Sequence, residues 1–201
     1  MLDRLAITAL RPVLERGAQV LVRLGVGANV VTLVGFVIGF GGALAIAASV
    51  PLLGLALLLL SRLADGLDGA VARLTQPTDR GAFLDITLDF VFYASVPLAF
   101  AVADPAANAL AAAVLLFAFV GTGTSFLAFA VLAAQRGIAN PEYPRKGLYY
   151  LGGLTEASET LLCFAVMCLW PAYFAWFAIV FALLCLLTLV TRVLAGWRLL
   201  A

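Results

Sequence analysis

The stretch that decides the fold is residues 65–89, DGLDGAVARLTQPTDRGAFLDITLD, in which four of the five aspartates, all except Asp79, lie in strongly apolar segments. On a helix, Asp65 and Asp68 project from nearly one face because they stand three residues apart. Asp85 and Asp89 stand four residues apart and share a face in the same way. The short, polar, proline-containing connection between these helices is tight enough to let the two faces meet. We therefore predict one cluster of four aspartates.

Four like charges at membrane depth need neutralisation, which either protons or a divalent cation can supply. Oxygen-only ligation favours a hard cation such as Mg²⁺, Mn²⁺ or Ca²⁺ over zinc, and the chain has no histidine. The alternative is that the aspartates form structural ion pairs. Ionisable groups inside a membrane are costly and usually functional, so we predict a site for one or two metal ions.

Small residues stand between the first two aspartates and beyond them: Gly66, Gly69, Ala70 and Ala72. They leave a helix surface nearly bare, so a flat or phosphorylated ligand can approach the backbone there. The alternative is that these residues only allow close helix packing, which is common in membrane bundles.

The composition is that of an integral membrane protein. The chain has 201 residues and is 65% hydrophobic, with a mean hydropathy of +1.13. We predict a single domain over residues 1–201 and no nucleic-acid partner. Cys163, Cys168 and Cys185 lie in apolar runs and are interpreted as small core residues. The first residues lack the basic start, apolar core and cleavage site of a signal peptide.

The predicted fold class is an all-α integral membrane protein. Residues 1–24 alternate apolar and basic positions, which predicts an amphipathic helix in the cytoplasmic interface, broken or restarted near Pro12. The alternative is a helix that caps the bundle. Residues 29–198 form the predicted six-helix bundle, whose transmembrane segments are 29–49, 51–74, 81–102, 107–134, 148–169 and 173–194.

Two features mark the first predicted span. Asn29 stands at its start and is predicted to cap the helix. Gly35 and Gly39 form a small-residue stripe, which favours packing inside the molecule over a dimer seam.

The distribution of charge predicts the orientation. With six spans, every Arg and Lys lies at or near one side of the membrane, and Asp104 is the lone charge in a loop on the other side. The positive-inside rule then places both termini, the aspartate cluster and the loop at 135–146 in the cytoplasm.

The motif in this stretch resembles the signature of the CDP-alcohol phosphotransferase family, D-x2-D-G-x2-A-R-x(7 or 8)-G-x3-D-x3-D. The chain fills all eight fixed positions, and its variable spacer has seven residues: Asp65, Asp68, Gly69, Ala72, Arg73, Gly81, Asp85 and Asp89. The start of the first span, Asn29-x-x-Thr32, is also similar to the family pattern.

The resemblance implies a phospholipid-synthesis enzyme of the bacterial inner membrane. It implies a CDP-lipid donor, commonly CDP-diacylglycerol, an alcohol acceptor, release of CMP, dependence on Mg²⁺ or Mn²⁺, and a homodimer. Asp65, Asp68 and Asp85 resemble the metal ligands. Asp89 is shared between a second metal and the general base that deprotonates the acceptor hydroxyl.

The same resemblance implies a donor site on the motif. Gly69 and Ala72 make room for the cytidine nucleotide, and Gly81 lets the two motif helices approach. Arg73 pairs with the aspartate cluster or with a donor phosphate, or else anchors the helix at the interface.

The acceptor is the least defined part of the reaction. Arg136, Arg145, Lys146 and Arg192 form a cationic pocket for a phosphorylated alcohol, or they set the topology and bind anionic lipid head groups. Glu156 and Glu159, two turns into the fifth span, recognise a hydroxylated or cationic acceptor, or they pair with an arginine (Arg62, Arg145 or Arg192). We favour pairing.

Glycerol 3-phosphate is our first choice of acceptor. Inositol phosphate, serine, another lipid head group, and choline or ethanolamine chemistry stay open. Two alternatives of other classes are a cation or proton transporter with an acidic intramembrane site and a catalytically silent lipid-binding homologue.

Overall fold

The computed structural model describes residues 2–138 and 153–200. Those residues form helices and connections without any strand. The elements are α1 (Leu2–Arg23), α2 (Ala28–Ala47), α3 (Pro51–Leu74), α4 (Asp79–Ala103), α5 (Pro105–Gln135), α6 (Ala157–Leu169), the 3₁₀ turn η1 (Pro171–Tyr173) and α7 (Phe174–Leu199). The all-α prediction is confirmed.

Four helical segments of the described chain are long and apolar enough to cross a membrane: α2, α4, α5, and η1 with α7. Helix α3 has 24 residues, but it carries Arg62, Asp65, Asp68 and Arg73. Helix α6 is apolar and has only 13 residues. The count of six spans therefore stays a prediction.

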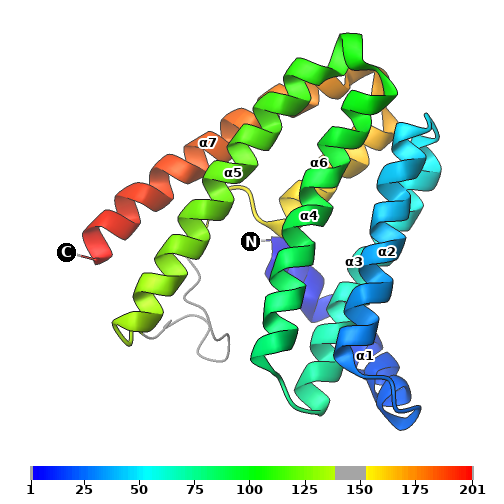
Figure 1. The fold of residues 1–201 in the computed structure, drawn as a ribbon, viewed down its shortest axis with the longest axis vertical. Helices are drawn as coiled ribbons and strands as arrows, with labels where there is room; N and C mark the ends of the chain where they lie inside the picture. Colours follow the sequence, from blue (N-terminus) through cyan, green and yellow to red (C-terminus); the bar gives the residue numbers. More distant parts are fainter. Residues whose placement is uncertain (1, 139–152, 201) are drawn as a thin grey trace.

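The helices form two groups that α4 joins (Figure 1). Helices α2 and α3 lie side by side on one flank of the molecule, with α1 packed against α3. Helices α5 and α7 lie together on the other flank. Helix α4 contacts both α2 and α5. The motif helix α4 thus lies between the two groups, and the other motif helix, α3, belongs to the group of α1 and α2.

The core is built from aromatic rings and small residues. Phe92, Phe164 and Phe174 are fully buried. The rings of Phe100 and Phe174 stack with their centroids 4.4 Å apart. Stacked and edge-on ring pairs add to the burial of their apolar area, and they fix α4 against α6 and α7.

Helices α2 and α3 approach closely because glycines of α2 lie at the contact between the two helices. A Cβ atom added at Gly35 would lie 2.8 Å from the Cβ of Ala64, and one at Gly39 would lie 2.5 Å from the Oγ of Ser61. The prediction that this stripe serves packing inside the molecule is confirmed. The predicted cap is wrong, because Gly27 occupies the N-cap position and Asn29 lies inside α2.

Helix α1 runs without interruption through Pro12, so the predicted break is wrong. Its Ala18 is buried with Ala70 and Val71 of α3. This packing favours the bundle-capping interpretation, while an interfacial position stays a prediction.

The fifth predicted span, 148–169, is also wrong at its start. Residues 153–156 are not helical, and α6 begins at Ala157. The reason is a capping box, in which the backbone N–H of Glu156 donates to Glu159 Oε2 at 3.2 Å and the side chain of Glu156 accepts from the backbone of Glu159. Residues 148–152 lie outside the described chain. The sixth predicted span, 173–194, corresponds to α7, which continues to Leu199.

Candidate metal centre and adjoining cavity

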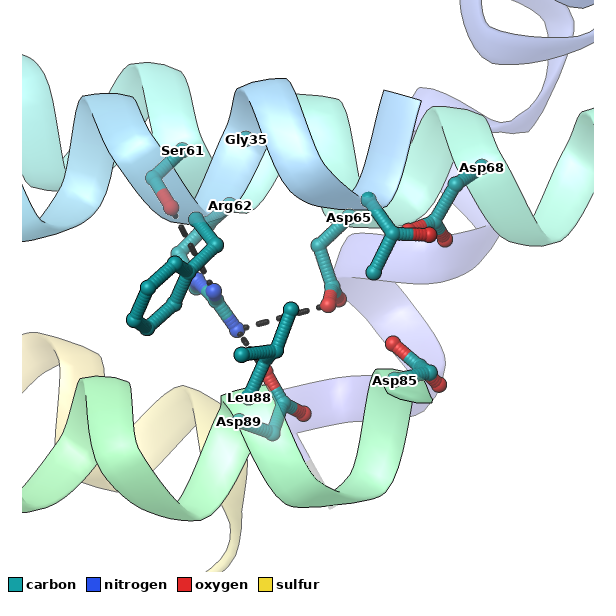
Figure 2. Close-up of a pocket in the computed structure, with 10 residues that line it drawn as sticks. Gly35, Ser61, Arg62, Asp65, Asp68, Asp85, Leu88 and Asp89 are labelled. Atoms are coloured by element: carbon teal, nitrogen blue, oxygen red, sulfur yellow. Dashed lines mark hydrogen bonds and ion pairs between the residues drawn. The ribbon is translucent and has the colours of Figure 1, made fainter. Parts of the chain in front are cut away.

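Three of the four predicted carboxylates converge at one point. Asp65 and Asp68 project from α3 and Asp85 from α4, and one oxygen of each lies within 4.8 Å of the others. Figure 2 shows the three side chains facing one another across the gap between the helices. The connection between α3 and α4 is short, as predicted, and Thr78 fixes it because its Oγ1 accepts the N–H of Gly81 at 3.1 Å.

The donor set fits a hard divalent cation. Asp68 is only 5% exposed, and its Oδ2 has no hydrogen-bond partner among the described residues. A buried carboxylate oxygen without a partner is costly, and a cation would satisfy it. The three facing groups offer only oxygen atoms, which Mg²⁺ and Mn²⁺ prefer.

The fourth carboxylate, Asp89, lies outside this triad and binds an arginine. Arg62 Nη1 donates to Asp89 Oδ1 at 2.6 Å and lies 3.5 Å from Asp65 Oδ1 (Figure 2). The charged partners of Arg62 are therefore aspartates of the motif, which excludes Arg62 from the three arginines considered as partners of Glu156 and Glu159. The sequence carried a signal only for the contact with Asp65, because Arg62 stands one helical turn before it on the same face; Asp89 is 27 residues away.

A large cavity adjoins the cluster. It has a volume of about 740 Å³ and lies between α4, α5, α7 and the start of α6. Its walls are mainly aromatic and apolar, with Phe90, Phe119 and Phe126 among them. Asp85 and Asp89 line both this cavity and the narrow pocket that holds the triad. The carboxylates thus stand at the boundary between a metal-sized pocket and a ligand-sized space.

The small residues of the motif divide into two sets. A Cβ atom at Gly69 would meet only the Nη1 of Arg73, at 3.2 Å, so that surface is open. A Cβ atom at Gly66 would meet Leu14 of α1 at 3.0 Å, and Ala70 is 2% exposed. The bare surface predicted at Gly66 and Ala70 is therefore wrong, because α1 covers it.

The other residues of the predicted donor site are Ala72, Arg73 and Gly81. Ala72 is half-buried and Arg73 is exposed. Gly81 does not face α3 as predicted, since a Cβ atom there would meet Asn29 Oδ1 of α2 at 3.0 Å. The close approach that Gly81 permits is between α4 and the start of α2.

Of the four predicted acceptor cations, the structure describes Arg136 and Arg192, and these two do not line the same cavity. Arg192 lines the cavity, is 7% exposed, and donates from Nη1 to the carbonyl of Thr122 at 3.2 Å. Arg136 ends α5, and its Nη1 donates to the carbonyl of Leu200. Arg145 and Lys146 lie outside the described residues. Among the two described cations, Arg192 alone lines the cavity.

A protein-family comparison decides the identity of the fold. The model described as CDP-alcohol phosphatidyltransferase matches residues 26–194. The chain belongs to the CDP-alcohol phosphatidyltransferase family. It is thus a member of a family of phosphate-group transferases, and the resemblance seen in the motif is confirmed.

Individual relatives agree with this family. The chain is 52% identical over 197 residues to the inner membrane protein YnjF of Escherichia coli K12, covering 98% of this chain and 96% of the relative. The crystal structure of Mycobacterium tuberculosis phosphatidylinositol phosphate synthase (PgsA1) with CDP-DAG bound has a TM-score of 0.75 at 22% identity, over 92% of this chain and 94% of that one. The same enzyme with manganese and citrate gives 0.67 at 24%, over 90% and 87%. Both PgsA1 structures therefore have the same fold as this chain.

Proposed function

We propose that this member of the CDP-alcohol phosphatidyltransferase family transfers a phosphatidyl-type group from a CDP-lipid to an alcohol hydroxyl and releases CMP. CDP-diacylglycerol is the proposed donor. The observation that carries the proposal is the convergence of three carboxylates within 4.8 Å beside a ligand-sized cavity. The family assignment favours group transfer over cation transport, because the same carboxylates then have a chemical role.

Asp65, Asp68 and Asp85 would hold Mg²⁺ or Mn²⁺, and Asp89 would share in binding a second ion. A bound ion supplies charge stabilisation at the phosphoryl oxygens and at the leaving phosphate. The chain itself supplies the general base of the reaction. Asp89 takes the proton of the acceptor hydroxyl, whose oxygen forms the new bond to phosphorus while the bond to the CMP oxygen breaks.

The donor lies along the open surface of α3. The bare backbone at Gly69 and the small side chain of Ala72 admit the cytidine nucleotide, and the exposed Arg73 pairs with a donor phosphate. The acyl chains remain in the membrane. Gly81 supports this site from the other motif helix by letting α4 approach α2.

The acceptor enters the large cavity and meets Arg192. A phosphorylated alcohol suits a nearly buried guanidinium, and glycerol 3-phosphate is the first choice. The proposed cationic pocket also includes Arg145 and Lys146, which lie outside the described residues, whereas Arg136 stands at the end of α5 and does not line the cavity. Support for an acceptor phosphate thus rests mainly on Arg192.

We further propose that the enzyme is a multi-pass protein of the bacterial inner membrane. Its long apolar helices and its similarity to an inner membrane protein of Escherichia coli support this location. The site faces the cytoplasm, where charged nucleotides occur, in agreement with the positive-inside rule. A homodimer and the single domain over 1–201 complete the proposal.

One assay tests the reaction. Purified protein in lipid–detergent micelles is given CDP-diacylglycerol labelled in the cytidine, Mg²⁺ or Mn²⁺, and one alcohol at a time, including glycerol 3-phosphate, inositol phosphate and serine. We expect release of labelled CMP that depends on one acceptor and a matching lipid product. Absence of CMP release with every acceptor would refute the proposal and favour a catalytically silent homologue.

A further inference from the structure

Arg62 occupies an unusual place in the site. Its side chain is 14% exposed, although it belongs to a helix in an apolar bundle. It makes its short contact, 2.6 Å, with Asp89 of α4, and a longer one, 3.5 Å, with Asp65 of its own helix. A charge-assisted hydrogen bond of this kind is stronger than a neutral one. The guanidinium therefore joins the two motif helices next to the carboxylate triad.

The guanidinium is held in place from other directions as well. Its carbon lies 3.8 Å from the centroid of the buried Phe92 ring, in a cation–π contact. Its Nη2 donates to the Oγ of Ser61 at 3.3 Å. The Phe92 ring itself fills the space left by Gly39. Because its surroundings fix the guanidinium, it can impose an orientation on the carboxylate that it binds.

Asp89 needs such an orientation. It lines both the narrow pocket of the triad and the large cavity, and its side chain is 36% exposed. An aspartate at that boundary can turn toward the triad or toward the cavity. Arg62 binds one oxygen, Oδ1, on the side of the narrow pocket that it lines. The second oxygen is then left for a ligand in the cavity.

We propose that Arg62 is the positioning residue of the transfer reaction, which holds Asp89 at the boundary so that its second carboxylate oxygen meets the acceptor hydroxyl. This inference rests on the proposed function and deepens it. Arg62 touches neither the acceptor nor the donor in this scheme, and it acts through Asp89. Its effect should therefore disappear when Asp89 can no longer act as a base.

A purely structural role for Arg62 predicts a different effect on metal binding. In that case its loss would disturb the whole pocket, including the three carboxylates, and would weaken metal binding. If it positions Asp89, its loss removes a positive charge near a cation site, and metal binding stays equal or becomes tighter. Turnover falls under both explanations, so metal affinity is the property that distinguishes them.

The test is a double-mutant cycle on the turnover of the purified enzyme. Arg62→Gln, Asp89→Asn and the double variant are compared by kcat for CMP release with the best acceptor. We expect Arg62→Gln to lower kcat about 10–100-fold, the range seen when a partner that orients a functional ligand is lost. In the Asp89→Asn background, the same change should lower kcat less than about twofold, because coupled residues are not additive. An undiminished loss there would overturn the proposal.

Binding of Mn²⁺, measured by electron paramagnetic resonance, supplies the readout that does not depend on activity. We expect the Kd of Arg62→Gln to equal that of the wild type within about threefold or to be lower. A rise of tenfold or more would show a structural role and contradict the proposal. Arg62→Lys, which keeps the charge without the planar fork, should lie between wild type and Arg62→Gln in kcat. It also serves as the test variant if Arg62→Gln does not fold.

The matched control is Arg11→Gln. Arg11 is an exposed arginine that pairs with Glu15 at 2.7 Å on α1, away from both cavities. We expect it to leave kcat and Mn²⁺ binding unchanged. If the wild-type protein releases no CMP, the proposed function itself is refuted. If the enzyme is active but the losses in the double-mutant cycle are additive, only the positioning role of Arg62 is refuted.

Discussion

Replacement of Gly39 by alanine tests how α2 supports the site. In the structure, the added Cβ atom would lie 2.5 Å from the Oγ of Ser61 and 2.7 Å from two carbons of the Phe92 ring. Real Cβ contacts are not this short, so α2 must shift or Phe92 must turn. The ring carries the guanidinium of Arg62 on its face, 3.8 Å from its centroid. A change at α2 thus reaches the motif helices.

The magnitude follows from a comparison with a neighbouring glycine. A Cβ atom at Gly41, on the same helix, would meet nothing within 4 Å. Both substitutions gain about 0.5–1 kcal/mol of helix stability from the loss of glycine flexibility, so this gain cancels in the comparison. The difference is the cost of overpacking, about 1–3 kcal/mol against Gly39→Ala. For a chain of this size, each kcal/mol corresponds to about 2–4 °C in Tm.

The assay is thermal unfolding of the purified variants in the same detergent, together with CMP release. We expect Gly39→Ala to have a lower Tm than Gly41→Ala and a lower kcat, while Gly41→Ala resembles the wild type. Equal Tm values for the two variants would refute the packing of Ser61 and Phe92 against α2. A lower Tm with wild-type turnover would show that the strain does not reach Arg62.

Three further predictions address the acceptor, the topology and one helix cap. Arg192→Gln should raise the acceptor KM about tenfold or more and leave the donor KM unchanged, because a charge-assisted contact to the acceptor phosphate contributes about 1.5–3 kcal/mol. An unchanged acceptor KM would contradict a phosphate-binding role. In a cysteine-free background, a cysteine at Thr78 should react with an impermeant reagent only after the cytoplasmic face is opened, and one at Ala106 should react from outside; reversed labelling would overturn the orientation. Asp104 caps α5 by accepting the N–H of Ala107 at 3.1 Å. Asp104→Ala should therefore lower the free energy of unfolding by about 0.5–2 kcal/mol, and Asp104→Asn should leave it unchanged. Equal losses for the two variants would disprove the cap.

The sequence predicted the motif helices well because their signals are local. The proline at Pro51 and the polar connection after Leu74 bound α3 as predicted. The spacing of Asp65 and Asp68 placed both on one face of α3, since helical periodicity sets that face, and the short connection brings Asp85 of α4 to them. The family motif specified the reaction class for the same reason: its residues are contiguous in the chain.

Long-range contacts account for what the sequence did not predict. Periodicity does not say which neighbour covers a helix face, so the contact of α1 with Gly66 and that of Asn29 with Gly81 were missed. The position of Asp89 depends on Arg62, which lies 27 residues away in the chain. The start of α6 depends on a capping box that lies within an apolar segment, where hydropathy predicts a longer helix.

The central claim is that the aspartate triad binds the metal that transfer requires. Its most direct test is CMP release from CDP-diacylglycerol by the wild type and by Asp68→Asn, with Mg²⁺ or Mn²⁺ and with excess chelator. We expect chelator to stop the wild type, added metal to restore it, and Asp68→Asn to lose at least about 100-fold, more than the loss of an outer partner causes. Undiminished CMP release in chelator, or wild-type turnover by Asp68→Asn, would contradict the account.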